Sequence, residues 1–277
     1  MKQYKPNYRV NNNFINIFKE SLNQVLKNKW LILLSIKKQN KLIYQQDFLS
    51  LLWIIVMPII PMTAYVLLAS IKVFNTVDEM PFVFYIVVGM FIWMLMSSII
   101  IKVMLSVKKE ASILRTTDTS ILITMLVQLG GIIFDTIIRS FAVFIIIIWL
   151  NIDVSILSLF YAFLSLIPII IISFSIGVIL AILDIIVQDT RKIVDIFFRY
   201  GLFISSVIFP FPSDGILGLI NSFNIFNTFV NSFRDLLYYG QLSNSVSFLL
   251  SSLIGILLFI IAIKLSYIFD YKIREYL

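Results

Sequence analysis

The chain has 277 residues, of which 60% are hydrophobic and 13% charged, whereas about 25% of the residues in a typical soluble domain are charged. This composition excludes an ordinary soluble domain and indicates a surface that largely faces lipid. The sequence contains no Cys and no His, which excludes disulfides, iron–sulfur clusters, thiolate or imidazole metal sites and histidine acid–base chemistry. The formal net charge is +7, and its distribution along the chain predicts the topology.

Residues 1–47 are expected to form a cytoplasmic N-terminal segment. Phe14, Phe18, Leu22 and Val25 recur at helical spacing, with lysines on the other faces. This pattern predicts a basic amphipathic helix that lies in the inner membrane interface. A simple topology anchor is a compatible alternative.

Residues 48–277 are expected to form one all-α integral membrane domain. A transmembrane helix needs about 20 mostly apolar residues. Six stretches meet this requirement and predict six transmembrane helices: Phe48–Ser70, Phe82–Val107, a span within Ile121–Leu150, Ser155–Val187, Ile193–Phe209 and Val246–Phe269.

The Lys and Arg residues orient these spans. Nine precede the first span, and nine more lie at alternate span ends. The remaining three connections hold only Lys72 and Arg234. Because basic residues concentrate on the cytoplasmic side, both termini are predicted to be cytoplasmic.

The connection from Phe209 to Gly240 is apolar but is interrupted by Pro210, Pro212 and Gly215. It predicts a re-entrant helical hairpin that enters from outside and returns, buried against protein. An amphipathic loop in the outer leaflet is the alternative.

The sequence lacks the phosphate-binding pattern GxxxxGK[ST], so the chain is not expected to hydrolyse ATP by itself. Without His or Cys, no nucleophile and base arrangement stands out. The chain is therefore predicted not to be an enzyme and to bind no cofactor.

Two pairs of ionisable residues fall within predicted spans. Asp135 and Arg139 are four residues apart, as are Asp195 and Arg199, so each pair is predicted to bridge on one helical face. Mutual neutralisation and a part in transport both remain open, because charges inside a membrane are costly and often functional.

Three aromatic residues in the first halves of the first two spans are candidates to line a substrate path: Trp53, Tyr85 and Trp93. Such rings stack on sugars. They also pack in cores and interface belts, which is the alternative here.

Several short motifs occur in a familiar order. Leu49–Trp53 with Pro58 is similar to L-G-x-L-W…P, and Pro81–Val83 precedes Gly89 and Trp93. Further along the chain, Val187–Thr190 is similar to V-R-D-T, Ser206–Pro210 to S-P-x-x-x-P, and Asn224 with Arg234-Asp235 to N-P…R. In this order the chain resembles the permease subunits of ABC-2 type polysaccharide exporters, which transport O-antigen, capsule or teichoic acid. It departs from their pattern at Ser50, Gln188, Val207 and Ile225.

The resemblance implies a homodimer joined on the cytoplasmic side to two copies of a separate ABC ATPase subunit, which binds the ATP. It implies a coupling helix within Lys108–Ser120, where Lys108, Lys109, Ile113, Leu114 and Arg115 would contact the ATPase, with a smaller contact from Asp189 and Arg191. It also implies an external gate at Pro210, Pro212, Gly215, Asn224 and Arg234.

The function implied is export of a lipid-linked polysaccharide across the bacterial inner (cytoplasmic) membrane by a multi-pass permease. Three alternatives remain: an ABC-2 permease for a drug or peptide, a proton-driven secondary transporter that uses Asp135 and Asp195, and a membrane scaffold without a transport function.

Overall fold

The computed structural model describes residues 13–46, 63, 80–210, 218 and 223–276, and all regular structure within those ranges is helical. Among these described residues, four helices are long and apolar enough to cross a membrane. They are α4 (Phe82–Lys109), α6 (Ile121–Trp149), α7 (Ile156–Ile186) and α11 (Ser245–Tyr276). The shorter ones are α1 (Phe14–Lys27), α2 (Lys29–Gln46), α5 (Ala111–Thr116), α8 (Thr190–Ile204) and α10 (Ile225–Tyr238).

Four of the six predicted spans are thereby confirmed as helices of spanning length. The first, Phe48–Ser70, lies outside the described residues. The fifth, Ile193–Phe209, needs correction, because α8 has only 15 residues and covers about 22 Å at 1.5 Å per residue. The apolar composition of residues 193–209 gave no sign of where the helix ends. Helix α8 ends before Ser205, and the next residue, Ser206, has a φ of 48°.

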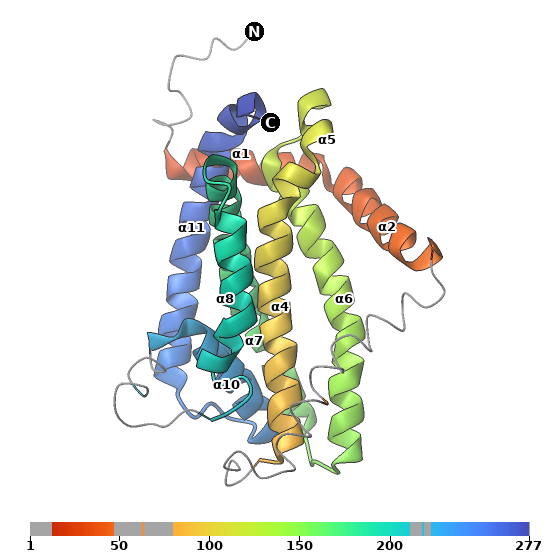
Figure 1. Cartoon of the computed structure of the whole chain (residues 1–277), viewed down its shortest axis with the longest axis vertical. Coiled ribbons are helices and arrows are strands. Elements are labelled where there is room, and N and C mark those ends of the chain that lie inside the picture. Colours follow the sequence, from red (N-terminus) through yellow and green to blue (C-terminus); the bar gives the residue numbers. More distant parts are fainter. Residues whose placement is uncertain (1–12, 47–62, 64–79, 211–217, 219–222, 277) are drawn as a thin grey trace.

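Helix α4 lies at the centre of the bundle. It packs against α6 and α7, and α7 in turn packs against α11 (Figure 1). The sequence explains this position, because α4 is apolar around its whole circumference, and such a helix is stable only when other helices surround it. Its residues from Phe84 to Met96 are almost all buried.

The two ends of the bundle differ. Helices α1 and α5 lie at the end where α11 finishes, and α10 lies at the opposite end (Figure 1). We call these the α5 end and the α10 end. The last residues of α4 also reach the α5 end, which is where the sequence predicts the cytoplasmic side.

The N-terminal segment forms two helices rather than one, separated at Asn28. Helix α1 buries Ile17 and Ser21, and Ile17 joins Ile263 and Tyr267 of α11 in a small apolar cluster. Its other apolar side chains, among them Phe18 and Leu22, remain exposed. A helix at these residues is therefore confirmed, and it lies across the ends of the long helices (Figure 1). Its place in a membrane interface stays a prediction.

Candidate functional site

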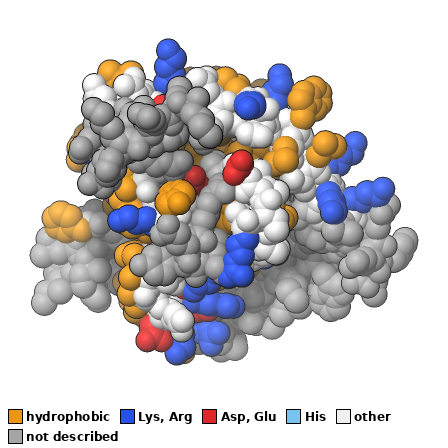
Figure 2. All heavy atoms as spheres, turned by 90° about the horizontal axis from the view of Figure 1, so that it is seen from above, with side chains coloured by type: hydrophobic (Ala, Val, Ile, Leu, Met, Phe, Trp, Pro, Cys, Tyr) orange, Lys and Arg blue, Asp and Glu red, His pale blue; other side chains and the backbone are white. Residues whose placement is uncertain are grey.

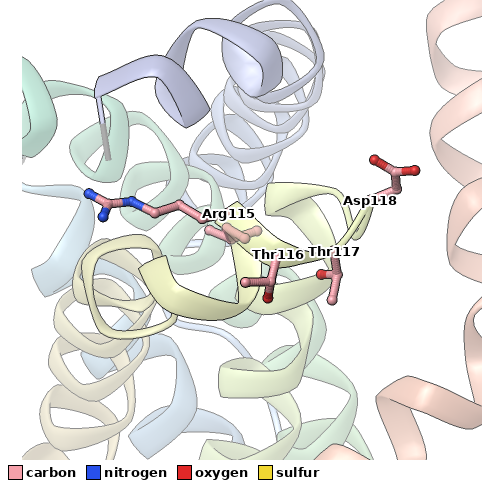
Figure 3. A pocket seen from close by; sticks show the side chains of 5 residues that line it. Arg115, Thr116, Thr117 and Asp118 are labelled. Carbon is pink, nitrogen blue, oxygen red and sulfur yellow. The ribbon is translucent and has the colours of Figure 1, made fainter.

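The connection between α4 and α6 forms a shallow hollow at the α5 end, lined by residues 114–118. The side chains of Arg115 and Asp118 point in opposite directions from it (Figure 3). Leu114 is 1% exposed, whereas Ile113 is 47% exposed. Of the two apolar residues predicted to contact an ATPase, only Ile113 is therefore available at the surface.

The second predicted contact region, the connection between α7 and α8, lies at the same end (Figure 1). The two regions are joined within the chain, because the Nζ of Lys108 lies 2.7 Å from Oδ2 of Asp184. This ammonium also donates to the backbone oxygen of Asp184 at 2.8 Å. Lys108 thus has an intramolecular partner, as do Asp189 and Arg191, and all three side chains are exposed, as is Lys109.

Asp184 was not among the predicted site residues. Its side chain is only 1% exposed, so its charge requires a nearby cation. A lone acidic residue in the last turn of a long apolar helix is the signal that could have identified it.

A second group of charges lies between α4 and α6. The Nζ of Lys102 lies 2.9 Å from Oδ2 of Asp135, and the Nη1 of Arg139 lies 3.5 Å from the Oγ of Ser98. The predicted bridge between Asp135 and Arg139 therefore needs correction. Spacing along one helix took no account of the neighbouring helix, which brings Lys102 to the carboxylate.

The pair predicted on α8 also needs correction. Asp195 lies 3.8 Å from Arg191, one turn before it. Arg199, on the other side of Asp195, is exposed. Either arginine satisfies the four-residue spacing, and spacing alone could not choose between them.

At the α10 end, the guanidinium of Arg234 is enclosed by backbone oxygens. Its Nε donates to the backbone oxygen of Tyr85 at 3.0 Å. Its Nη1 donates to the oxygen of Ser206 at 2.8 Å, and its Nη2 to that of Val207 at 2.7 Å. The same guanidinium carbon lies 3.5 Å from the centre of the Tyr85 ring. Arg234 is only 1% exposed, so this arrangement fastens α10 to α4 and to the end of α8.

Gly89 leaves the space that this guanidinium occupies. A Cβ at this position would lie 1.9 Å from Nη2 of Arg234 and 2.7 Å from the oxygen of Val207. Tyr85, one turn earlier on α4, donates its hydroxyl to the oxygen of Ser206 at 2.8 Å. We call Tyr85, Gly89, Ser206, Val207 and Arg234 the arginine clasp.

Asn224 supports the clasp from the start of α10. Its Oδ1 accepts hydrogen bonds from the backbone nitrogens of Phe226 and Asn227 at 3.0 and 3.4 Å, which caps the helix. Its Nδ2 donates to the Oγ of Ser205 at 3.0 Å. The asparagine therefore joins the first turn of α10 to the end of α8.

The electrostatics of the clasp follow from burial. Burial lowers the pKa of the Arg234 guanidinium, and the nearby Tyr85 and Asp235 act in the opposite direction. Burial raises the pKa of the Asp235 carboxyl, an effect that a hydrogen bond from Ser243 opposes. Because a guanidinium is not deprotonated in proteins, the clasp holds a cation.

Of the residues predicted to form an external gate, Arg234 belongs to the clasp. Pro210 is exposed, and Asn224 and Arg234 have the contacts given above. Pro212 and Gly215 lie outside the described residues, as does most of the first half of the predicted hairpin.

The candidate path residues are buried in the core. Tyr85 is 5% and Trp93 3% exposed. The indole nitrogen of Trp93 donates to the backbone oxygen of Phe198 at 3.3 Å, and its ring contacts Phe197, Phe198 and Phe226. Both rings are packed inside the described bundle, and their place on a substrate path stays a prediction. Trp53 lies outside the described residues.

In comparisons with known proteins, no family model and no curated protein matches this chain. The fold and the contacts described above are therefore the basis for the functional argument.

Proposed function

We propose that the chain is the membrane-spanning permease subunit of an ATP-binding-cassette exporter, powered by a separate ATPase and acting on a lipid-linked polysaccharide. The observation that carries this proposal is the arrangement of the α5 end. There, a short helix between two long apolar helices and the exposed start of α8 lie at one end of the bundle (Figure 1). A soluble partner that binds this end would contact both.

Charge at the α5 end supports a cytoplasmic orientation. Seen from that end, the molecule presents several Lys and Arg side chains (Figure 2). Lys109, Arg115, Arg191 and Lys272 are among its exposed cations. Because cytoplasmic connections are rich in Lys and Arg, this end is expected to face the cytoplasm, where ATP is available to a partner.

The exposed surface of α8 supports a second copy of the chain. Arg191, Asp195 and Arg199 follow one another at intervals of four residues and are exposed or half-buried. Charges at this spacing form one stripe on a helix, and a charged stripe is unfavourable against lipid tails. Contact with another copy, or with water between two copies, would remove this cost.

The polysaccharide substrate rests on the resemblance in sequence motifs. The drug or peptide permease shares the same architecture and is distinguished by substrate. The proton-driven alternative is distinguished by its energy source, because it would transport without any ATPase.

The test is to search for an ATPase reading frame beside that of this chain and to co-express the two proteins. We expect the two proteins to copurify in mild detergent as two copies of each, with ATP hydrolysis only in the complex. Ile113→Asp should release the ATPase, because it places a charge in an apolar contact. Leu114 is unsuitable for this purpose, since it is buried within the chain.

The matched control is Gln241→Asp, an exposed position in the connection beyond α10. It adds the same charge at the opposite end and should leave the complex intact. If Ile113→Asp has no effect on copurification or on the ATPase rate, residues 108–120 do not couple the chain to an ATPase. Export by the chain without any ATPase would support the proton-driven alternative instead.

A further inference from the structure

We infer that the α5 end holds one phospholipid of the inner leaflet, with an acyl chain under α1 and an aminoethyl phosphate headgroup between α1 and the start of α6. The headgroup hollow shares Asp118 with the connection proposed to contact the ATPase, whereas the acyl-chain groove has no residue in that connection. The inference does not depend on the proposed function.

The acyl-chain part is an apolar groove with a volume of about 330 Å³. Helix α1 contributes Phe18 and Leu22, and the other walls come from α6, α7 and α11. These three helices are long and apolar enough to span a membrane, so the groove opens where hydrocarbon is the solvent. The residues that close it include Leu126, Ile170, Phe174 and Phe259.

Beside the groove lies a hollow of different character, with a volume of about 320 Å³. It is lined by Gln24, Lys27 and Asn28 at the end of α1 and by Asp118, Thr119 and Ser120 before α6. The two cavities are adjacent along both chain segments, since Val25 and Leu122 line the groove. An apolar groove that continues into a polar hollow fits an amphiphile.

Three features of the hollow indicate the headgroup. Lys27 supplies a cation for a phosphate. Ser120 is 7% exposed, and its Oγ has no hydrogen-bond partner among the described residues. Ser120 also precedes the first turn of α6, and helix N-termini favour phosphate groups.

Two backbone donors of this turn are already used, because the nitrogen of Ile123 donates to the backbone oxygen of Ser120 at 3.0 Å. The nitrogen of Ile121 donates to Oδ1 of Asp270 at 2.9 Å, so Asp270 competes with a phosphate at the helix start. The phosphate is therefore assigned to Lys27 and Ser120 rather than to the first backbone nitrogen.

Asp118 selects among phospholipids. Its carboxylate lines the same hollow as Lys27 and points away from Arg115 (Figure 3). Against an anionic glycerol headgroup this carboxylate is repulsive. Against an ethanolamine headgroup it meets the ammonium while Lys27 meets the phosphate, and this pairing favours the ethanolamine lipid.

The experiment uses the full chain in vesicles of equal phosphatidylethanolamine and phosphatidylglycerol, extracted gently and examined by native mass spectrometry. We expect one retained phospholipid, predominantly phosphatidylethanolamine. Leu126→Trp fills the groove and should lower the fraction of protein that retains a lipid by about tenfold. A modest loss of binding free energy is enough to produce a change of this size. Ile145→Trp on the exposed face of the same helix is the control and should retain the lipid.

The headgroup is tested by two further variants. Lys27→Gln should lower retention, while Lys29→Gln, an exposed residue outside the hollow, should not. Asp118→Asn should shift the retained lipid from phosphatidylethanolamine towards phosphatidylglycerol. An unchanged lipid ratio in Asp118→Asn would overturn the headgroup assignment.

A second test of the groove blocks it after the protein has folded. Because the sequence contains no cysteine, a single introduced cysteine can be labelled selectively. Leu22→Cys, labelled with a bulky maleimide after folding, blocks the groove at its α1 wall. Ile15→Cys, 72% exposed on the same helix and not part of the groove, is the matched label. Equal lipid retention after both labels, or in Leu126→Trp and wild type, would show that no acyl chain occupies this groove.

Discussion

The two ends of α4 hold their charges in opposite ways. At the α10 end, the cation of Arg234 is 1% exposed and donates to backbone oxygens of Tyr85, Ser206 and Val207. Towards the α5 end, the side chains of Lys102 and Lys108 are 42% and 41% exposed, and each meets a carboxylate.

This difference distinguishes a cation that holds segments of the chain together from cations that can bind a partner. A guanidinium that donates to several backbone oxygens fixes the position of every segment that supplies one, and leaving those oxygens unpaired is costly. An ammonium with one carboxylate partner and an exposed face keeps donors for something outside the chain. We therefore expect the α10 end to be the more rigid one and the α5 end to respond to partners.

The strongest test of the comparison is Arg234→Met. It removes this donor from the buried backbone oxygens of Tyr85 and Val207, whereas the oxygen of Ser206 keeps the hydrogen bond from the Tyr85 hydroxyl. Each such loss costs about 1–3 kcal/mol, so we expect the free energy of unfolding to fall by about 2 kcal/mol or more. The measurement is the melting temperature and folded yield in detergent. Arg199→Met is the control, because Arg199 is exposed, and equal destabilisation by both variants would contradict the clasp.

The next test is Gly89→Ala. The added Cβ would lie 1.9 Å from Nη2 of Arg234, so the guanidinium must move. Overpacking of this kind costs about 1–3 kcal/mol, which exceeds the gain of about 1 kcal/mol from replacing glycine in a helix.

The matched control is Gly131→Ala in α6, where the nearest atoms, in Gln39, are 3.5 Å from the added Cβ. This substitution should be neutral or slightly stabilising. If the two alanine variants have the same melting temperature, the clasp tolerates displacement and does not fix α10.

At the charges between α4 and α6, the test is a double-mutant cycle of Lys102→Gln and Asp135→Asn. Because half of the lysine is exposed, we expect a coupling free energy of about 1 kcal/mol in the free energy of unfolding. The cycle of Asp135→Asn with Arg139→Gln should give a smaller coupling. A larger coupling free energy for Asp135 with Arg139 than for Asp135 with Lys102 would support the same-helix pair that the sequence predicts.

The long helices were predictable because their signal is local. Length and apolar composition decide whether a segment spans a membrane, and they identified α4, α6, α7 and α11. The same signal failed at Ile193–Phe209, where a turn near Ser206 ends the helix. Composition counts apolar residues but contains no information on where the backbone turns.

Partners across helices were less predictable. The spacing of Asp135 and Arg139 describes one helix, whereas the described ion pair joins Asp135 to Lys102, 33 residues away. Arg234 was selected from a motif, yet its contact with Tyr85 spans 149 residues. The packing of Tyr85 and Trp93 was equally hard to predict, because an aromatic residue in a core and one beside a path look alike in sequence.

The smallest expected effect on stability is at the start of α8. The Nζ of Lys192 lies 3.0 Å from Oδ1 of Asp189, and the two side chains are 79% and 71% exposed. Ion pairs this exposed contribute about 0–1 kcal/mol, so Lys192→Gln and Asp189→Asn should each leave the melting temperature of the isolated chain nearly unchanged.

The effect of these two substitutions should appear only with a partner bound, because both residues lie in the connection proposed to contact the ATPase. We therefore expect Asp189→Asn to weaken copurification with the ATPase while the isolated chain remains as stable as wild type. A loss of stability without the partner would place this pair with the fastening contacts of the α10 end, and the distinction between the two ends of α4 would then fail.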